Sequence, residues 1–137
     1  MTNFTLKLIT PSGIAYDGEI AEASLPTPDG QITILANHKP IITQLSPGEI
    51  KLKASGKEKY LATEGGVAYV SQNFLKILAD TAESADSLDL AKIEEARKKA
   101  EHQKAVAADE EEFAFAEALL EKQLAKIKFI KKRKHHS

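Results

Sequence analysis

The positions of glycine and proline divide this chain of 137 residues into two unlike parts. All seven glycines and all five prolines lie at or before Gly66. Because glycine and proline mark turns, this distribution predicts many short elements before Gly66 and a few long elements after it. We therefore expect a β-rich front part and a helical back part.

The front part has the pattern of a series of short strands. Phe4, Leu6 and Leu8 alternate with other residues, as the inward positions of a half-buried strand do. Turn signals follow at residues 11–13 and at Gly18. Further strands are predicted at residues 20–25, 31–35, 50–53, 60–62, 67–70 and 75–79. Short strands separated by turns at this spacing are typical of an all-β sandwich.

After Asp80 the apolar residues follow a helical period. One stripe with spacings of three or four residues contains Leu90, Ile93, Ala96 or Arg97, and Ala100. A second stripe contains Phe113, Ala116, Leu120, Leu124 and Ile127. Ser87 or Asp89 can cap the first helix, and Asp109 with Glu112 resembles a capping box for the second. The predicted fold class is therefore α+β, in which an antiparallel two-helix hairpin packed through alanines follows the sandwich.

The connection between the two predicted helices, KAVAAD at residues 104–109, contains neither glycine nor proline. Its composition therefore permits one continuous helix of about 44 residues, roughly 66 Å long. The first helix offers mainly alanine for packing, whereas burial of one large apolar side chain contributes about 1.5–3 kcal/mol. The sequence thus allows two conformations, a closed hairpin and an extended helix.

Composition excludes several classes of protein. The chain has no cysteine, which rules out disulfides, thiol catalysis and thiolate zinc sites. The first residues, MTNFTLKLIT, lack the basic and apolar blocks of a signal peptide. No stretch approaches the roughly 18 apolar residues that cross a bilayer. We expect a cytoplasmic protein that is peripheral to something larger.

The residues with catalytic potential lack the partners that catalysis would need. His38 has no second histidine and no cysteine in the front part with which to bind a metal. Gly65-Gly66 lacks the flanking residues of a phosphate-binding loop, and the acids at 110–112 fit helix capping. His38 is therefore interpreted as a residue that fixes a loop or faces a partner. A hydrolase whose site forms only at an oligomer interface remains an alternative.

The net charge of −1 conceals an uneven distribution. Residues 1–86 carry 7 Lys or Arg and 10 Asp or Glu, a net −3, whereas residues 87–137 carry 12 and 10, a net +2. No acid follows Glu121, and the basic residues beyond it are Lys122, Lys126, Lys128, Lys131, Lys132, Arg133 and Lys134. Such a run complements a helix dipole, or binds an acidic protein surface, an anionic membrane or nucleic acid. The aromatic content of 6% and the acidic front part argue against nucleic acid.

Two stretches of the sequence resemble the epsilon subunits of bacterial and chloroplast F-type ATP synthases. PDGQITILANHKPIITQLSPGEI, residues 28–50, is similar to that family's glycine loop, strand, Asn-His-x-Pro turn and Pro-Gly segment. EGGVAYVSQNFLKILADTAE, residues 64–83, resembles its Gly-Gly strand and the segment that follows. Ala36 and Lys39 stand where the family often has proline and alanine. With the alanine-rich helices and their basic end, the resemblance covers nearly the whole chain.

The resemblance implies a ten-stranded sandwich at residues 1–86 and a regulatory two-helix domain at residues 87–137. It implies a non-catalytic subunit of the central stalk, which couples the catalytic head of a proton-translocating ATP synthase to the membrane rotor ring. Such a subunit lies at the cytoplasmic face of the cell membrane, or at the stromal face of the thylakoid in a plastid. The sandwich is expected to contact the gamma subunit and the c subunits through Pro28, Asp29, Gly30, Gln31, Asn37 and His38.

The resemblance also implies that the helices regulate ATP hydrolysis. In that family they extend along gamma, contact alpha and beta and inhibit hydrolysis, and their basic end passes an acidic stretch of beta. Some members bind ATP through a Leu/Ile-Asp-x-x-Arg-Ala motif. Leu88 and Asp89 match this motif here, but Lys92 replaces the arginine and Ile93 the alanine. Because lysine lacks the planar fork of arginine, we expect no required cofactor and at most weak regulatory ATP binding at Asp89.

Overall fold

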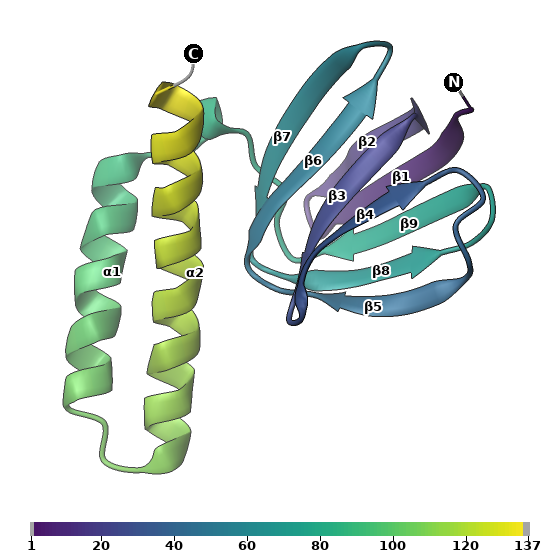
Figure 1. The fold of residues 1–137 in the computed structure, drawn as a ribbon. Helices are drawn as coiled ribbons and strands as arrows, with labels where there is room; N and C mark the ends of the chain where they lie inside the picture. The colour runs from purple at the N-terminus through teal and green to yellow at the C-terminus, as the bar shows by residue number, and fades with distance from the viewer. Residues whose placement is uncertain (1, 136–137) are drawn as a thin grey trace. The chain divides into compact units, whose positions relative to one another are not determined.

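The computed structural model describes residues 2–135, with side chains described as far as Arg133. The chain forms two compact units that divide between Glu83 and Ser84, close to the boundary at residues 86–87 expected from the sequence. The first unit consists of strands and the second of helices (Figure 1).

The first unit is a sandwich of two sheets. The five-stranded sheet has the order β2-β1-β9-β8-β5, with β1 at Phe4–Thr10, β2 at Gly13–Ile20, β5 at Ile41–Leu45, β8 at Gly66–Val70 and β9 at Phe74–Ala79. The four-stranded sheet has the order β4-β3-β6-β7, with β3 at Glu22–Thr27, β4 at Gly30–Leu35, β6 at Gly48–Ala54 and β7 at Lys57–Thr63. Strands β1 and β9 pair in parallel, and the other neighbours pair antiparallel.

The sandwich core follows from the alternation of apolar residues along the strands. Phe4, Leu6 and Leu8 are buried, as their spacing predicted, because every second side chain of β1 points to the same face of the sheet. The largest fully buried side chains of the sandwich are Leu6, Leu8, Ile20, Leu25, Ile34, Leu45, Ile50, Leu52, Leu75 and Ile77. Each contributes about 1.5–3 kcal/mol by leaving water, so this core dominates the stability of the unit.

The expected ten-stranded sandwich is wrong in its count, since the described residues 2–83 contain nine strands. The turn predicted at Gly18 is also wrong, because Gly18 lies inside β2 and pairs with Leu6. Strand β5 gave no recognisable pattern in the sequence. Four of the five residues of β5 are exposed or half-buried, as are seven of the eight of β2, which was likewise not predicted, so both lack the alternation that marked β1 and β9.

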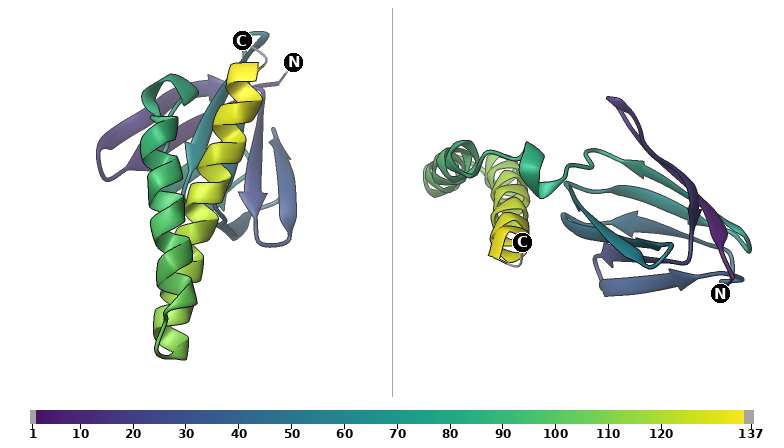
Figure 2. Two further views of the ribbon diagram at one scale, coloured as in Figure 1. Left: turned by 90° about the vertical axis from the view of Figure 1, so that its left-hand side faces the viewer. Right: turned by 90° about the horizontal axis from the view of Figure 1, so that it is seen from above.

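The second unit contains the 3-10 helix η1 (Ala85–Ser87) and the antiparallel helices α1 (Leu90–Ala105) and α2 (Glu110–His135), which lie side by side (Figure 2). Of the two candidate caps for α1, Asp89 is the N-cap, and Asp109 starts α2 as predicted. The Asp109 carboxylate accepts from the Glu112 N–H at 2.8 Å, and the Glu112 carboxylate accepts from the Ala108 N–H at 2.9 Å. Both caps satisfy amide groups that have no partner inside the helix.

Alanine packing in the hairpin is confirmed, because Ala100 of α1 and Ala116 of α2 are only 3% and 1% exposed. The stripe predicted for the second helix is wrong at Phe113 and Leu124, which are 42% and 46% exposed. At about 100° per residue, both lie roughly 40–80° around α2 from the buried residues Ala116 and Ile127. The buried face of α2 is therefore narrower than the predicted stripe and leaves Phe113 and Leu124 outside it.

The connection between the helices is a turn in this structure. Helix α1 ends at Ala105 and α2 begins at Glu110, so the hairpin is the conformation present. In α1 only Ile93 and Ala100 are buried, whereas α2 buries Ala116, Ile127, Phe129 and Ile130, so α1 contributes the smaller share of the apolar packing. None of the helices in the described residues has the length and hydropathy required to cross a membrane.

Candidate functional site

The turn between β3 and β4 positions the residues at 28–31 expected to face a partner. The Thr27 hydroxyl donates to the Gly30 carbonyl at 2.6 Å and accepts from the Asp29 N–H at 3.3 Å. Gly30 has a φ of 113°, a conformation that favours glycine. Pro28, Asp29, Gly30 and Gln31 are all exposed. The turn therefore has a fixed conformation, and its exposed residues are accessible to a partner.

The loop between β4 and β5 holds Asn37 and His38. Asn37 has a left-handed φ of 66°, and its N–H donates to the Gln72 carbonyl at 2.8 Å, which ties the loop to the β8–β9 turn. The His38 N–H donates to the Leu35 carbonyl at 3.3 Å, and its ring Nδ1, when protonated, donates to the Lys39 carbonyl at 2.7 Å. The described residues contain no group of three or more side chains that could bind a metal. His38 therefore has the geometry of a residue that fixes a loop.

The structure does not bring these two segments together. The turn at 28–31 begins β4, and Asn37 and His38 follow its end (Figure 1). The strand between them has six residues, about 20 Å at roughly 3.3 Å per residue. Two separate contact points, at opposite ends of one strand, are therefore available to partners.

The outer face of the five-stranded sheet is a surface that the sequence analysis missed. Strand register aligns Ile42, Tyr69 and Lys76 across β5, β8 and β9, with Phe74 and Leu78 on the same side of β9. This apolar sheet face carries the exposed side chains Ile14 at 58%, Ile42 at 73%, Tyr69 at 40%, Phe74 at 39% and Leu78 at 38%. A hollow of about 300 Å³ lies among Tyr69, Phe74 and Leu78.

The sequence does contain a signal for this face. In β9, FLKILA, Leu75 and Ile77 are buried while Phe74 and Leu78 on the opposite side are equally apolar. Strands with large apolar residues on both faces are typical of sheets that are buried on both faces, by the same chain or by a partner. Clustered exposed apolar residues mark interaction sites, whereas scattered ones need no explanation.

The basic residues of α2 surround the helix instead of sharing one side. At about 100° per residue, Lys122, Lys126 and Arg133 lie within about 40° of one another, and these three are half-buried. Lys128, Lys131 and Lys132 point in other directions and are exposed. Lys134 lies in α2, but its side chain is outside the described residues, as are His136 and Ser137. The basic end therefore presents charge in several directions.

The Asp89 carboxylate, the expected ATP contact, is engaged in helix capping. Its Oδ1 accepts from the N–H groups of Ala91 at 3.0 Å and Lys92 at 3.3 Å. Leu88 and Ile93, the first and last residues of the motif, are each 8% exposed, so both serve the apolar packing. Capping explains Asp89 without a nucleotide.

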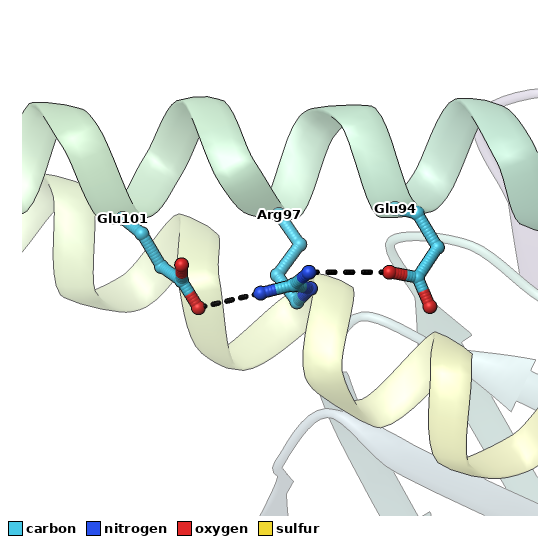
Figure 3. Close-up of polar contacts among 3 residues, drawn as sticks. All are labelled: Glu94, Arg97 and Glu101. Atoms are coloured by element: carbon cyan, nitrogen blue, oxygen red, sulfur yellow. Dashed lines mark hydrogen bonds and ion pairs between the residues drawn. The ribbon is translucent and has the colours of Figure 1, made fainter.

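Helix α1 carries ion pairs within itself. Arg97 donates to Glu101 at 2.7 Å and to Glu94 at 3.2 Å, so that its guanidinium lies between two carboxylates (Figure 3). The hydrogen bonds to Glu101 and then to Glu94 raise the pKa of Arg97, whose side chain therefore stays charged. Pairs at these spacings join neighbouring side chains on one side of a helix and support it modestly.

Comparison with known proteins identifies a family from the sequence. Residues 3–85 match the family model described as ATP synthase, Delta/Epsilon chain, beta-sandwich domain. The chain is 35% identical to the ATP synthase epsilon chain of Psychrobacter arcticus, with 100% of both chains covered. It is 40% identical over 100 residues to that of Latilactobacillus sakei, which covers 71% of this chain and 69% of the relative.

Two solved structures share the fold. A chain in the structure of the Euglena gracilis mitochondrial ATP synthase OSCP/F1/c-ring superposes with a TM-score of 0.80 at 23% identity, covering 91% of this chain and 79% of that one. A chain in the structure of the Tetrahymena thermophila mitochondrial ATP synthase central stalk and c-ring gives a TM-score of 0.64 at 13% identity, covering 96% of both.

Proposed function

Because the chain belongs to the family of ATP synthase epsilon chains, non-catalytic subunits of that complex, we propose that it couples the catalytic head to the membrane rotor ring as part of the central stalk. We further propose that its helices inhibit ATP hydrolysis. The observation that supports this most is the match to a bacterial epsilon chain over the full length, which includes both the sandwich and the helical unit.

The apolar sheet face supports docking on the gamma subunit. Five large apolar side chains are exposed on one side of a single sheet, and burial of such surface drives association at roughly 25 cal/mol per Å² before the costs of binding. Gamma is the stalk partner that family membership implies. On this proposal gamma covers Tyr69, Phe74 and Leu78, while charged residues such as Lys76 fix the register.

The two loop segments support contacts with two partners. Residues 28–31 and the Asn37-His38 loop lie at opposite ends of β4, about 20 Å apart. We propose that these two segments together contact the gamma subunit and the c subunits. The protein would then be peripheral to the membrane, at its cytoplasmic face, or at the stromal face of the thylakoid in a plastid.

The helical unit supports the inhibitory role. Helix α1 buries only Ile93 and Ala100, so its release from α2 exposes little apolar surface of its own. The basic end, with charge on several sides of α2, suits a path between alpha and beta past an acidic stretch of beta. No cofactor is required for this role. ATP binding, if regulatory, would be weak, because capping already occupies the Asp89 Oδ1.

Co-purification tests the stalk role. The chain, added to an alpha–beta complex with or without gamma, should co-purify only when gamma is present. Retention by alpha–beta alone would contradict docking on gamma. Strong, salt-sensitive retention on DNA or on anionic lipid vesicles, without binding to gamma, would instead favour the alternative of a basic-tailed adaptor.

A further inference from the structure

We propose that Lys104 is an ionic latch that holds the helical hairpin closed, so that the charge of this one side chain sets how often the hairpin opens. The latch is a property of the isolated chain. Only its consequence, control of ATP hydrolysis, rests on the proposed function.

Lys104 lies in the last turn of α1 and contacts two residues of α2. Its Nζ is 3.7 Å from the Glu117 Oε2 and 5.2 Å from the centre of the Phe113 ring. Phe113 and Glu117 are four residues apart, so they present neighbouring side chains on one side of α2. One ammonium group therefore joins α1 to α2 through an ion pair and a cation–π contact, directly beside the turn.

These contacts exist only in the hairpin. If residues 104–117 formed one continuous helix, Lys104 would be about 13 Å along the axis from Phe113 and about 20 Å from Glu117, at roughly 1.5 Å per residue. An interaction made in one conformation and absent from the other shifts the equilibrium between them. The Arg97 pairs with Glu94 and Glu101 lie within α1 and persist in both conformations, so they do not bias the equilibrium (Figure 3).

The latch adds to an interface in which α1 itself buries little apolar surface. Of the residues of α1, only Ile93 and Ala100 are buried. The Lys104 and Glu117 side chains are 34% and 45% exposed, so their pair alone contributes little, and the cation–π contact adds to it. Together they change the ratio of open to closed hairpin on the order of five-fold.

A buried reporter measures opening in the intact chain. The protein has no cysteine, so Ala116→Cys introduces a single thiol at a position that is 1% exposed in the closed hairpin. Its rate of reaction with a thiol reagent reports how often the interface opens, even when the open form is rare. In this background Lys104→Met should raise the reaction rate on the order of five-fold.

Matched variants separate the effect of the Lys104 charge from the other effects of a substitution. Lys99→Met removes the same charge from an exposed position of the same helix and should leave the rate unchanged. Lys104→Arg should keep most of the protection, and the double exchange Lys104→Glu with Glu117→Lys should restore part of it. Raising the salt from about 0.01 M to about 1 M shortens the screening length from about 30 Å to about 3 Å and should raise the rate with Lys104 present more than with Met.

Equal reaction rates for the chain with Lys104 and with Lys104→Met would overturn the latch, as would an equal effect of Lys99→Met. The outcome does not depend on the proposed function. If Lys104→Met opens the hairpin but leaves hydrolysis by a reconstituted alpha–beta–gamma head unchanged, the latch stands and the inhibitory role fails.

Discussion

At the scale of single residues, hydrogen bonds to the backbone explain the roles of residues that the sequence could only single out as candidates. His38 attracts attention as a lone histidine, yet its backbone and ring hydrogen bonds serve the loop that it lies in. Asp89 matches a nucleotide motif, yet its carboxylate caps α1. Sequence identifies such residues but not their partners, because the amides that they bind are placed only by the fold.

Gly66 is predicted to be essential for the sandwich. It has a φ of 147°, and a Cβ there would collide with the Leu78 carbonyl oxygen and lie 2.8 Å from the Ala79 Cα. Gly66→Ala should therefore lower the free energy of unfolding by about 2–5 kcal/mol, from strain and overpacking together. Gly30→Ala, at a φ of 113° with open space around it, should cost only the strain, about 1–3 kcal/mol. Urea unfolding of both variants checks this, and equal losses would contradict the collision.

Asp89 is predicted to act as a cap. Asp89→Ala should lower the stability of the helical unit by about 0.5–2 kcal/mol, whereas Asp89→Asn should retain most of it because asparagine caps well. Thermal melting followed by the helical circular dichroism signal measures this. If Asp89→Ala left the helices unchanged but abolished a measurable affinity for ATP, Asp89 would be a nucleotide ligand and not a cap.

At the scale of elements, alternation and helical spacing predicted the parts whose burial is regular. Strands β1 and β9 and helix α1 follow this rule, and α2 follows it at Ala116 and Ile127. Strands β2 and β5, the two edges of the five-stranded sheet, could not be recognised because most of their side chains are exposed or half-buried. The outward positions of Phe113 and Leu124 could not be predicted either, since the rotation of α2 depends on how closely Ala100 and Ala116 let the helices approach.

The apolar sheet face gives the prediction that belongs to this scale. Phe74→Glu places a charge where gamma is proposed to cover the sheet, and should weaken binding to a gamma-containing head at least about 30-fold, the range of a hot-spot residue. Phe74 is 39% exposed in the free chain, so the fold should persist. Thr33→Glu, an exposed position of the four-stranded sheet, is the control and should bind normally. Normal binding of Phe74→Glu would place gamma elsewhere.

At the scale of the whole molecule, the division into two units could be predicted from the sequence, because neither glycine nor proline occurs after Gly66. The sandwich is stabilised by a large apolar core, whereas the hairpin buries fewer large side chains and also depends on alanines, caps and a few ionic contacts. The resemblance to epsilon subunits added the partners, which no composition or periodicity could supply. The structure adds the surfaces on which substitutions can test binding to those partners.

The most direct test of the account is ATP hydrolysis by an alpha–beta–gamma head with and without the helices. The full chain should inhibit hydrolysis, and the chain ending at Asp86 should bind as tightly but inhibit little, because the sandwich alone docks on gamma. The β-sheet signal in circular dichroism confirms that the shortened chain is folded. Equal hydrolysis with the full and the shortened chain, both bound, would contradict the inhibitory role and leave the basic end of α2 as a solvated helix terminus.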